Sequence, residues 1–322
     1  MSDGLVLVHG LVIDSSIPLP GAGAAPAAAA ASVDLTLRLG EPVTVGGDLP
    51  PGRLVALLER GGRLWHAVVR DDDGWLVRFG GAADVRLSAD LSTATAHVDP
   101  DFSLDLFEVL ANGFLLATVL QLRGDLVLHA SAVHTTDGAL ALVGHSGVGK
   151  STVATLLARA GAPLIGDDVV RVDDPGGTPL VRRGSAEARL RLAARGLGAG
   201  LEGVRETADD RLAVTPPVAT GDRILLRAVL FPAPDREHDE VEVRRVAPAD
   251  ALVQLLASPR VLGWLDRGDL ARQLGQCADL AGRVPALRVQ VPWGPPFAQD
   301  LGARVLAAVR GRLTERAGSS SA

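Results

Sequence analysis

Lysine, cysteine, methionine and tyrosine are almost absent from this chain. Among 32 basic residues only Lys150 is a lysine, and there is one cysteine, one methionine and no tyrosine. A single cysteine, Cys277, excludes an internal disulfide and a cysteine-based zinc site. This composition fits a reducing, cytoplasmic environment. Because arginine supplies nearly all the positive charge, the position of the one lysine is informative.

Basic clusters and long apolar runs are also missing. The formal net charge is −6 at pH 7 without a basic block, which argues against nucleic acid and against an anionic membrane as partners. The longest apolar run, Val109 to Leu120, is shorter than the roughly 20 residues that span a bilayer, so we expect a buried helix. No basic residue precedes Arg38, and we therefore expect no conventional signal peptide.

Length and pattern predict two domains. A chain of 322 residues with 47% hydrophobic residues can form about two packed cores. Residues 1–100 contain stretches of strand composition separated by Gly, Pro and Asp turns, which predict a small β-rich N-terminal domain. These stretches are Leu5 to Ile13, Val33 to Leu39, Arg63 to Arg70, Gly74 to Phe79 and Ala94 to Val98. We expect a connecting helix over 101–124, capped by Ser103, then an α/β domain over 125–313 and a tail over 314–322.

One segment has the residues of a nucleotide phosphate site. It matches the pattern G-x-x-x-x-G-K-[ST] and lies between an apolar strand, Ala139 to Val143, and a helical run, Ser151 to Ala160. In such a loop the backbone N–H groups surround phosphate oxygens, the lysine reaches the β and γ phosphates, and the hydroxyl ligates Mg²⁺. The predicted binding residues are Gly144, His145, Ser146, Gly147, Val148, Gly149, Lys150, Ser151 and Thr152. A glycine-rich turn without function is the alternative, but the only lysine lies inside this pattern.

A predicted hairpin precedes the loop and adds a histidine to it. Alternating apolar residues on both sides of Asp137 and Gly138 are typical of two strands joined by a tight turn. If these two residues form the turn, Ser131 faces Gly144, and His129 projects near the rim of the loop. His129 is therefore a candidate site residue, with a hydrogen-bonded core histidine as the alternative.

Two adjacent carboxylates follow the helical run. The segment Ala162 to Val172 predicts a strand that carries Asp167 and Asp168 where its apolar part becomes polar, a place where structural acids are uncommon. A solvated strand end is the alternative. Further along, the segment from Arg182 to Arg211 has seven arginines and helical stretches. Most of these arginines should form a solvated face, while one or two could reach a phosphate.

The stretch from Leu128 to Val172 resembles the catalytic core of HPr kinase/phosphorylase and related serine kinases, whose P-loop type is shared with phosphoenolpyruvate carboxykinase. The resemblance rests on His129, 15 residues before the loop, and on the acid pair, 17 and 18 residues after Lys150. It implies an α/β P-loop kinase core of the HPr-kinase/carboxykinase type, with a smaller β-rich N-terminal domain and a helical C-terminal part. It also implies transfer of the γ-phosphate of ATP to a serine hydroxyl of a peptide or small protein.

The same resemblance implies a role for each site residue. Lys150 would neutralise developing charge, and Asp167 would accept or orient the hydroxyl proton. Ser151 and Asp168 would hold Mg²⁺. His129 would contact the phosphates or steady the acids.

Departures from the family limit the acceptor. Thr152 stands where enzymes acting on HPr have an acid, which argues against HPr itself and against the phosphorylase reaction. A carboxykinase is disfavoured because no second lysine exists for its metal site. Two other functions stay open: a small-molecule kinase acting on free serine or another metabolite, and a nucleotide-binding protein without transfer activity. The sequence also leaves open whether the chain forms a homo-oligomer.

Overall fold

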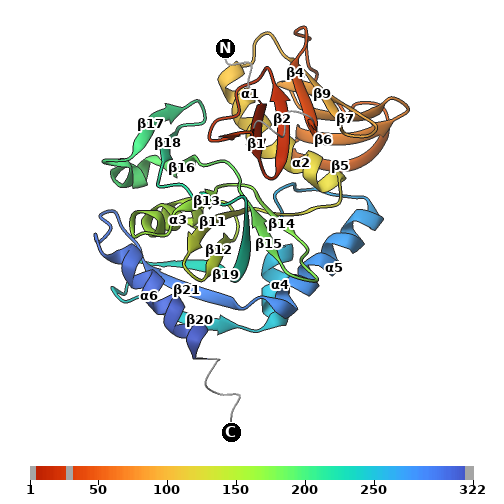
Figure 1. Cartoon of the computed structure of the whole chain (residues 1–322). Coiled ribbons are helices and arrows are strands. Elements are labelled where there is room, and N and C mark those ends of the chain that lie inside the picture. Colours follow the sequence, from red (N-terminus) through yellow and green to blue (C-terminus); the bar gives the residue numbers. More distant parts are fainter. Residues whose placement is uncertain (1–4, 27–31, 316–322) are drawn as a thin grey trace. The chain divides into compact units, whose positions relative to one another are not determined.

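The protein is a mixed α/β chain with two large sheets. The structure, a computed structural model, describes residues 5–26 and 32–315 (Figure 1). The chain divides into two compact units, unit 1 (Met1–Asp125 and Arg260–Gln273) and unit 2 (Leu126–Pro259 and Leu274–Ala322). Residues 101–124, expected to connect the domains, belong to unit 1. Most of the predicted tail, residues 316–322, lies outside the described part of the chain.

Unit 1 is built on a nine-stranded sheet with the order β3-β1-β2-β4-β9-β8-β7-β6-β5. Strands β5 to β9 pair antiparallel in sequence order, whereas β4 pairs in parallel with β2 and β9. The strands are β1 (Leu5–Val8), β2 (Leu11–Ser15), β3 (Gly23–Ala24), β4 (Leu35–Leu39), β5 (Arg53–Arg60), β6 (Arg63–Asp71), β7 (Gly74–Phe79), β8 (Ala83–Ser88) and β9 (Thr93–Val98). The sequence patterns did not identify β3, β5 and β8.

The first predicted strand is in fact two strands. β1 and β2 form an antiparallel hairpin, and the turn between them has φ of 53° at His9 and 73° at Gly10. Two successive residues of positive φ match the twist of a two-residue hairpin. The prediction of a single strand was wrong because apolar residues continue on both sides of the turn, and Gly10 alone marks it.

A buried helical segment follows the sheet. It consists of α1 (Leu104–Leu110), the π-helical turn η2 (Ala111–Leu115) and α2 (Leu116–Leu122). The Ser103 hydroxyl caps α1 by accepting the Leu106 N–H, as predicted. By length and composition the span Leu104–Leu122 could cross a membrane, but 61% of its most apolar window is buried inside the protein. Such burial is typical of a core helix, which the apolar run had indicated.

Unit 2 contains a sheet in which five strands point the same way. The order is β10-β14-β15-β19-β12-β11-β13, and β21 pairs with β19 and β20. β12 is parallel to β19 and β19 to β21, while β11 runs antiparallel between β12 and β13. The carboxyl ends of β12, β13, β19 and β21 therefore lie at one edge. The strands are β10 (Leu126–Leu128), β11 (Ala130–Thr135), β12 (Gly138–Val143), β13 (Leu164–Gly166), β14 (Val170–Asp173), β15 (Leu180–Arg182), β19 (Arg223–Asp235), β20 (Glu242–Val246) and β21 (Ala286–Pro292).

Helices cover both faces of this sheet (Figure 1). Along β12, Ala141 and Val143 belong to one apolar core, and Leu140 and Leu142 belong to another, because successive side chains of a strand point to opposite faces. The first core includes residues of α4 (Pro248–Leu256) and α5 (Arg267–Arg283). The second includes residues of α3 (Lys150–Arg159) and α6 (Leu301–Thr314). A strand that is apolar on both faces is typical of such a covered sheet.

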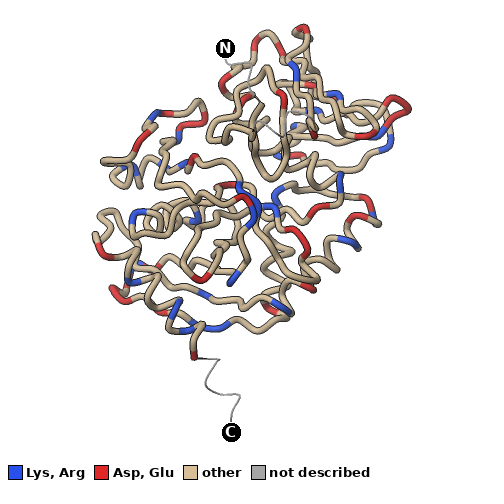
Figure 2. The backbone as a smooth tube through the Cα atoms, in the orientation of Figure 1, with Lys and Arg blue, Asp and Glu red and all other residues tan. Residues whose placement is uncertain are grey.

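The arginine-rich segment forms a small sheet of its own. Its order is β16-β18-β17, with β16 (Ala188–Arg191), β17 (Glu202–Thr207), β18 (Arg211–Thr215) and the 3₁₀ helix η3 (Leu192–Gly198). The predicted helical stretches are limited to η3, because pairing with β18 and burial of Leu190 in the second core keep β16 extended. Basic and acidic residues are interspersed along the backbone rather than gathered in one block (Figure 2).

The hairpin formed by β11 and β12 has a register different from the predicted one. Thr135 pairs with Gly138, so residues 136 and 137 form the turn and Ser131 does not face Gly144. Gly138 lies in the strand with φ of 127°, and a methyl group placed on it would come within 2.6 Å of the Leu225 carbonyl oxygen. The glycine thus serves the close approach of β19 rather than the turn. The sequence cannot show this non-local contact.

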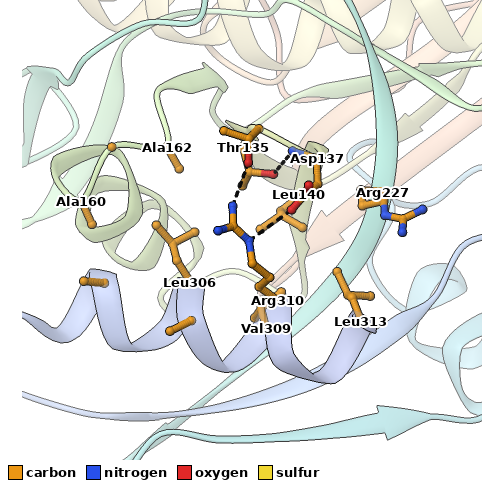
Figure 3. Close-up of a pocket in the computed structure, with 14 residues that line it drawn as sticks. Thr135, Asp137, Leu140, Ala160, Ala162, Arg227, Leu306, Val309, Arg310 and Leu313 are labelled. Carbon is orange, nitrogen blue, oxygen red and sulfur yellow. Dashed lines mark hydrogen bonds and ion pairs between the residues drawn. The ribbon is translucent and has the colours of Figure 1, made fainter. Parts of the chain in front are cut away.

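A cavity of about 320 Å³ lies at the opposite edge of the sheet (Figure 3). The turn between β11 and β12, the C-terminal end of α3 and one side of α6 line it. Arg310 of α6 donates to Thr136 at 2.7 Å and to Asp137 at 3.2 Å. Because α3 begins beside Gly149 and ends at this cavity, the cavity is separate from the predicted phosphate site.

Candidate functional site

The segment from Gly144 to Ser151, called the glycine loop below, connects β12 to α3. Gly147 and Gly149 have φ of 89° and 92°, a backbone region that glycine adopts at little cost. Gly149 is the N-cap of α3. The first N–H groups of a helix have no partner within the helix and create a site for anions. The loop therefore has the shape and the donors of a cradle for phosphate.

Lys150 lies inside the glycine loop. Its side chain is buried, and Nζ donates to the carbonyl oxygens of Gly144 at 2.7 Å and His145 at 3.1 Å. A buried ammonium group requires such partners. The carbonyl contacts hold the positive charge against the loop, where a bound phosphate would meet it. His145 and Ser146 are exposed.

Ser151 and Asp167 are in direct contact. The Ser151 hydroxyl donates to Asp167 Oδ1 at 2.9 Å, and the Ser131 hydroxyl donates to the same oxygen. The backbone N–H of Arg189 donates to the other oxygen, Oδ2, at 3.1 Å. Asp167 is only 4% exposed. Burial raises the pKa of Asp167 above its ordinary value, and the Asp168 charge adds to this, although the hydrogen bonds oppose it. A hydroxyl beside a carboxylate is an oxygen donor set of the kind Mg²⁺ prefers.

Asp168 breaks the strand that was predicted over Ala162 to Val172. Its φ is 70°, which is uncommon for a residue other than glycine. The strand consequently ends as β13 and resumes as β14, which pairs with different neighbours. The prediction of one continuous strand was wrong because apolar composition alone does not reveal this backbone turn. As a result, Asp167 is buried at the base of the glycine loop and Asp168 is partly exposed.

Asp168 lies between a histidine and an arginine. His129 Nε2 is 3.4 Å from Asp168 Oδ1, and Arg189 Nη2 is 3.6 Å from Asp168 Oδ2. Arg189 also approaches Asp209 at 3.1 Å, and Arg211 lies 3.4 Å from the same carboxylate. The side chains of His129, Asp168 and Arg189 are each about one-fifth exposed. Asp168 is thus the accessible carboxylate of the pair, and Arg189 fixes one side of it.

The structure brings the predicted site residues together, but in different pairs. His129, both aspartates and the glycine loop meet at one edge of the unit 2 sheet. Ser151 contacts Asp167 rather than Asp168, with which it was expected to share a metal ion. His129 lies 3.4 Å from Asp168, which fits the second of its two expected roles, steadying the acids. Within residues 5–26 and 32–315, no three His, Cys, Asp or Glu side chains form a ready-made metal site.

Two neighbours of the site were not predicted. A methyl group on Gly149 would overlap the ring of Trp293, which follows β21 and meets Phe297 edge to face at 5.3 Å. Ser131, on β11, donates to Asp167. The parallel order of β12, β19 and β21 could not be derived from the sequence, so Trp293 gave no signal. Ser131 is a polar residue in an apolar strand, which is a signal that sequence reasoning could have used.

Comparisons with known proteins add little to this geometry. No protein-family model matches the chain, and no curated protein matches it. Among solved structures, that of the Hpr(Ser) kinase/phosphatase from Coxiella burnetii aligns with 60% of this chain and 99% of that chain, with a TM-score of 0.32 and 12% sequence identity. A TM-score of this size does not establish a shared fold. Membership of the HPr kinase family therefore stays a prediction.

Proposed function

We propose that the protein is an ATP-dependent cytoplasmic kinase that transfers the γ-phosphate to a serine hydroxyl of a peptide or small protein. The observation that supports this function most directly is the contact between Ser151 and Asp167 at the base of the glycine loop. A hydroxyl that follows a phosphate-binding loop and lies on a carboxylate is the arrangement with which nucleotide-binding loops hold Mg²⁺. The accessible Asp168 beside it supplies a group that can act on an acceptor.

The residues present fit a magnesium nucleotide. The glycine loop and the start of α3 would bind the phosphates, Lys150 would contact the β and γ phosphates, and Ser151 with Asp167 would ligate Mg²⁺. Protein sites commonly hold Mg²⁺ through one or two side chains together with the substrate phosphates, so two oxygen ligands are sufficient. Held by Ser151 and Asp167, Mg²⁺ would neutralise part of the phosphate charge.

The contacts favour a division of roles between the acids that is the reverse of the sequence-based one. Asp167 accepts hydrogen bonds from two hydroxyls and one backbone N–H. A carboxylate has about four acceptor positions, and the one that remains would be taken by Mg²⁺ rather than by a substrate hydroxyl. Asp168 is more exposed and lies beside His129. We therefore assign proton acceptance to Asp168, with His129 positioning it. A carboxylate is a weak base, but phosphoryl transfer depends more on position than on basicity.

The single lysine provides a direct test of nucleotide binding. An acyl-phosphate derivative of ATP should acylate Lys150, and an excess of ATP and Mg²⁺ should protect it. The matched control is Lys150→Arg, which has no lysine at all, so any label that remains on it is non-specific. Peptide mapping by mass spectrometry gives the labelled position. If Lys150 is not labelled, or if ATP and Mg²⁺ do not protect it from labelling, the proposed function is wrong.

The acceptor requires a separate test. The intact protein with ATP and Mg²⁺ should phosphorylate a serine-containing peptide library, with Lys150→Arg as the inactive control, and free serine should be compared in parallel. If free serine or another metabolite reaches a kcat/KM of about 10⁴ M⁻¹s⁻¹, the lower end of the usual enzyme range, and every peptide is inert, the small-molecule kinase replaces the proposal. Nucleotide binding without transfer to any acceptor would favour a binding protein.

A further inference from the structure

Arg191 is an arginine placed directly on the glycine loop. A methyl group placed on Gly147 would come within 2.5 Å of Arg191 Nη2 and 3.2 Å of Cζ. Gly147 is the exposed midpoint of the loop, with φ of 89°. The guanidinium group therefore lies against the backbone that forms the predicted phosphate cradle, although the residue belongs to a different sheet.

The strand β16 determines which two arginines reach the site. Side chains alternate along a strand, so Arg189 and Arg191 share one face of β16, while Leu190 between them is fully buried in the second core. The first arginine approaches Asp168 and the second approaches Gly147. Burial of Leu190 fixes the strand and therefore both positions.

The two arginines differ in their partners. Arg189 is neutralised by Asp168 and Asp209, and Lys150 Nζ donates to two loop carbonyls. In contrast, the Arg191 guanidinium forms no hydrogen bond or ion pair with any residue in the described part of the chain. Its charge is consequently available to an anion on the loop. A planar guanidinium can bind two phosphate oxygens at once.

We propose that Arg191 is a catalytic residue that contacts the transferred phosphoryl group, an inference that rests on the proposed kinase function. In the reaction, the acceptor oxygen forms a bond to the γ-phosphorus, the bond from that phosphorus to the bridging oxygen of ADP breaks, and the acceptor proton passes to Asp168. Arg191 gains and loses no atom; it stabilises the negative charge on the transferred group. Arginines with this role contribute about 10³–10⁵-fold to kcat in other phosphoryl-transfer enzymes.

The test uses MgADP alone and MgADP with aluminium fluoride, which imitates the transferred group, because the acceptor is not identified. Arg191→Ala should leave the Kd for MgADP within about twofold of wild type and weaken the aluminium fluoride complex by about tenfold or more, while intrinsic ATP hydrolysis falls by a similar or larger factor. Arg191→Lys should be intermediate, since it keeps the charge and loses the planar donor pair.

Arg227→Ala is the matched control. Arg227 is also an exposed arginine without a hydrogen bond or ion pair within the described residues, but it lines the cavity at the opposite edge of the sheet (Figure 3). This variant should behave as wild type in every measurement. If Arg191→Ala binds MgADP with aluminium fluoride as tightly as wild type, the Arg191 proposal is wrong while the kinase proposal stands. If wild type itself binds neither complex, the kinase proposal fails and Arg191 has no such role.

Discussion

The hydroxyl of Ser151 donates a hydrogen bond to Oδ1 of Asp167 across 2.9 Å, although Asp167 is only 4% exposed. Burying a carboxylate is unfavourable, and burial raises the pKa of Asp167 although the hydrogen bonds it receives oppose this. The ionised form of Asp167 is therefore disfavoured in the ligand-free protein. A divalent cation between the carboxylate and a nucleotide would compensate that charge, which explains how a stability cost can serve binding.

Asp167→Asn should therefore stabilise the ligand-free protein at neutral pH and impair Mg²⁺-dependent nucleotide binding. A carboxyl group whose pKa is raised in the folded protein stabilises the fold at acid pH. This stabilisation is complete below the pKa of the unfolded state, near 3.8, and is lost as the pH rises through the pKa of the folded state. The variant should melt higher than wild type at pH 7, and the difference should shrink toward pH 4. Its affinity for MgATP should fall about tenfold or more.

Thermal melts without nucleotide over this pH range measure the first effect, and titration calorimetry with MgATP measures the second. The amide introduced by Asp167→Asn can keep both ends of the hydrogen-bond network, because the two serine hydroxyls can accept as well as donate. A variant that is less stable than wild type at every pH would contradict an unfavourable buried carboxyl group at position 167.

Asp168→Asn should separate catalysis from binding. Because Asp168 contacts His129 and Arg189 rather than Ser151, its neutralisation should leave the Kd for MgADP within about twofold while phosphoryl transfer, or ATP hydrolysis, falls about 10²–10⁴-fold. His129→Gln should reduce the rate less, since it removes a positioning partner and leaves the carboxylate. Steady-state kinetics and MgADP binding on the same preparations give both quantities. If Asp168→Asn loses as much affinity as Asp167→Asn for the same magnesium nucleotide, Asp168 is the Mg²⁺ ligand, as the sequence had predicted.

Gly149→Ala tests the contact between the glycine loop and Trp293. The alanine at position 149 would have to adopt a positive φ, and its methyl group would overlap the indole ring of Trp293. The free energy of unfolding should therefore fall by about 2–3 kcal/mol. Gly161→Ala is the matched control, because Gly161 has φ of 97° but no atom within 4 Å of the added methyl group. It should show the backbone cost alone, about 1 kcal/mol.

Urea unfolding measures the free energy of unfolding of both variants and of the double variant Gly149→Ala with Trp293→Ala. The double variant removes the overlapping ring and should lose less stability than the sum of the two single changes. Equal losses for Gly149→Ala and Gly161→Ala would show that Trp293 does not constrain the loop.

The sequence predicted the parts of the site that depend on local structure. The glycine loop was recognisable because its glycines, Lys150 and Ser151 follow one another between a strand and a helix. His129 was placed near it by a hairpin register that differs from the observed one, and the two aspartates were placed there by the resemblance to a kinase family. These predictions concern residues 129–168, in which elements close in sequence are also close in space.

Contacts that depend on sheet order could not be predicted. Arg191 reaches Gly147 because β16 pairs with β18, and Trp293 reaches Gly149 because β21 lies two strands away from β12. The hairpin register was predicted wrongly because Gly138 is required by the close approach of Leu225 rather than by the turn. The positive φ of Asp168, which separates the two acids, is not specified by residue type, because aspartate adopts such a φ more often than most residues but only in a minority of positions.

Unit 1 should lose stability in acid through His66. The side chain is 2% exposed and its ring lies 4.3 Å from that of Phe114, while Nε2 is 2.9 Å from the Leu262 carbonyl oxygen. Nδ1 is buried without a hydrogen-bond partner among the residues that the structure describes. Burial lowers the pKa of His66 from 6.5 to about 4, partly opposed by the bond to Leu262. The neutral ring is therefore the form that fits the fold.

A base with a lowered folded pKa contributes stability that is present above its unfolded pKa and is lost as the pH falls through the folded value. Between pH 6.5 and about 4, unit 1 should lose about 3 kcal/mol from this residue. His66→Gln keeps a donor for the Leu262 carbonyl but cannot be protonated. It should be less stable than wild type at pH 7, because the ring contact with Phe114 is lost, yet its stability should change less between pH 7 and 4.

Hydrogen exchange of peptides from β6 and β7, measured at several pH values and corrected for intrinsic rates, reports the opening of this sheet without interference from unit 2. His97→Gln is the control, because His97 lies on β9 of the same sheet and is more exposed, with Nδ1 2.9 Å from the Glu41 carbonyl oxygen. That variant should retain the acid sensitivity of wild type. If His66→Gln loses protection between pH 6.5 and 4 as steeply as wild type does, His66 is not the source of the acid sensitivity of this sheet.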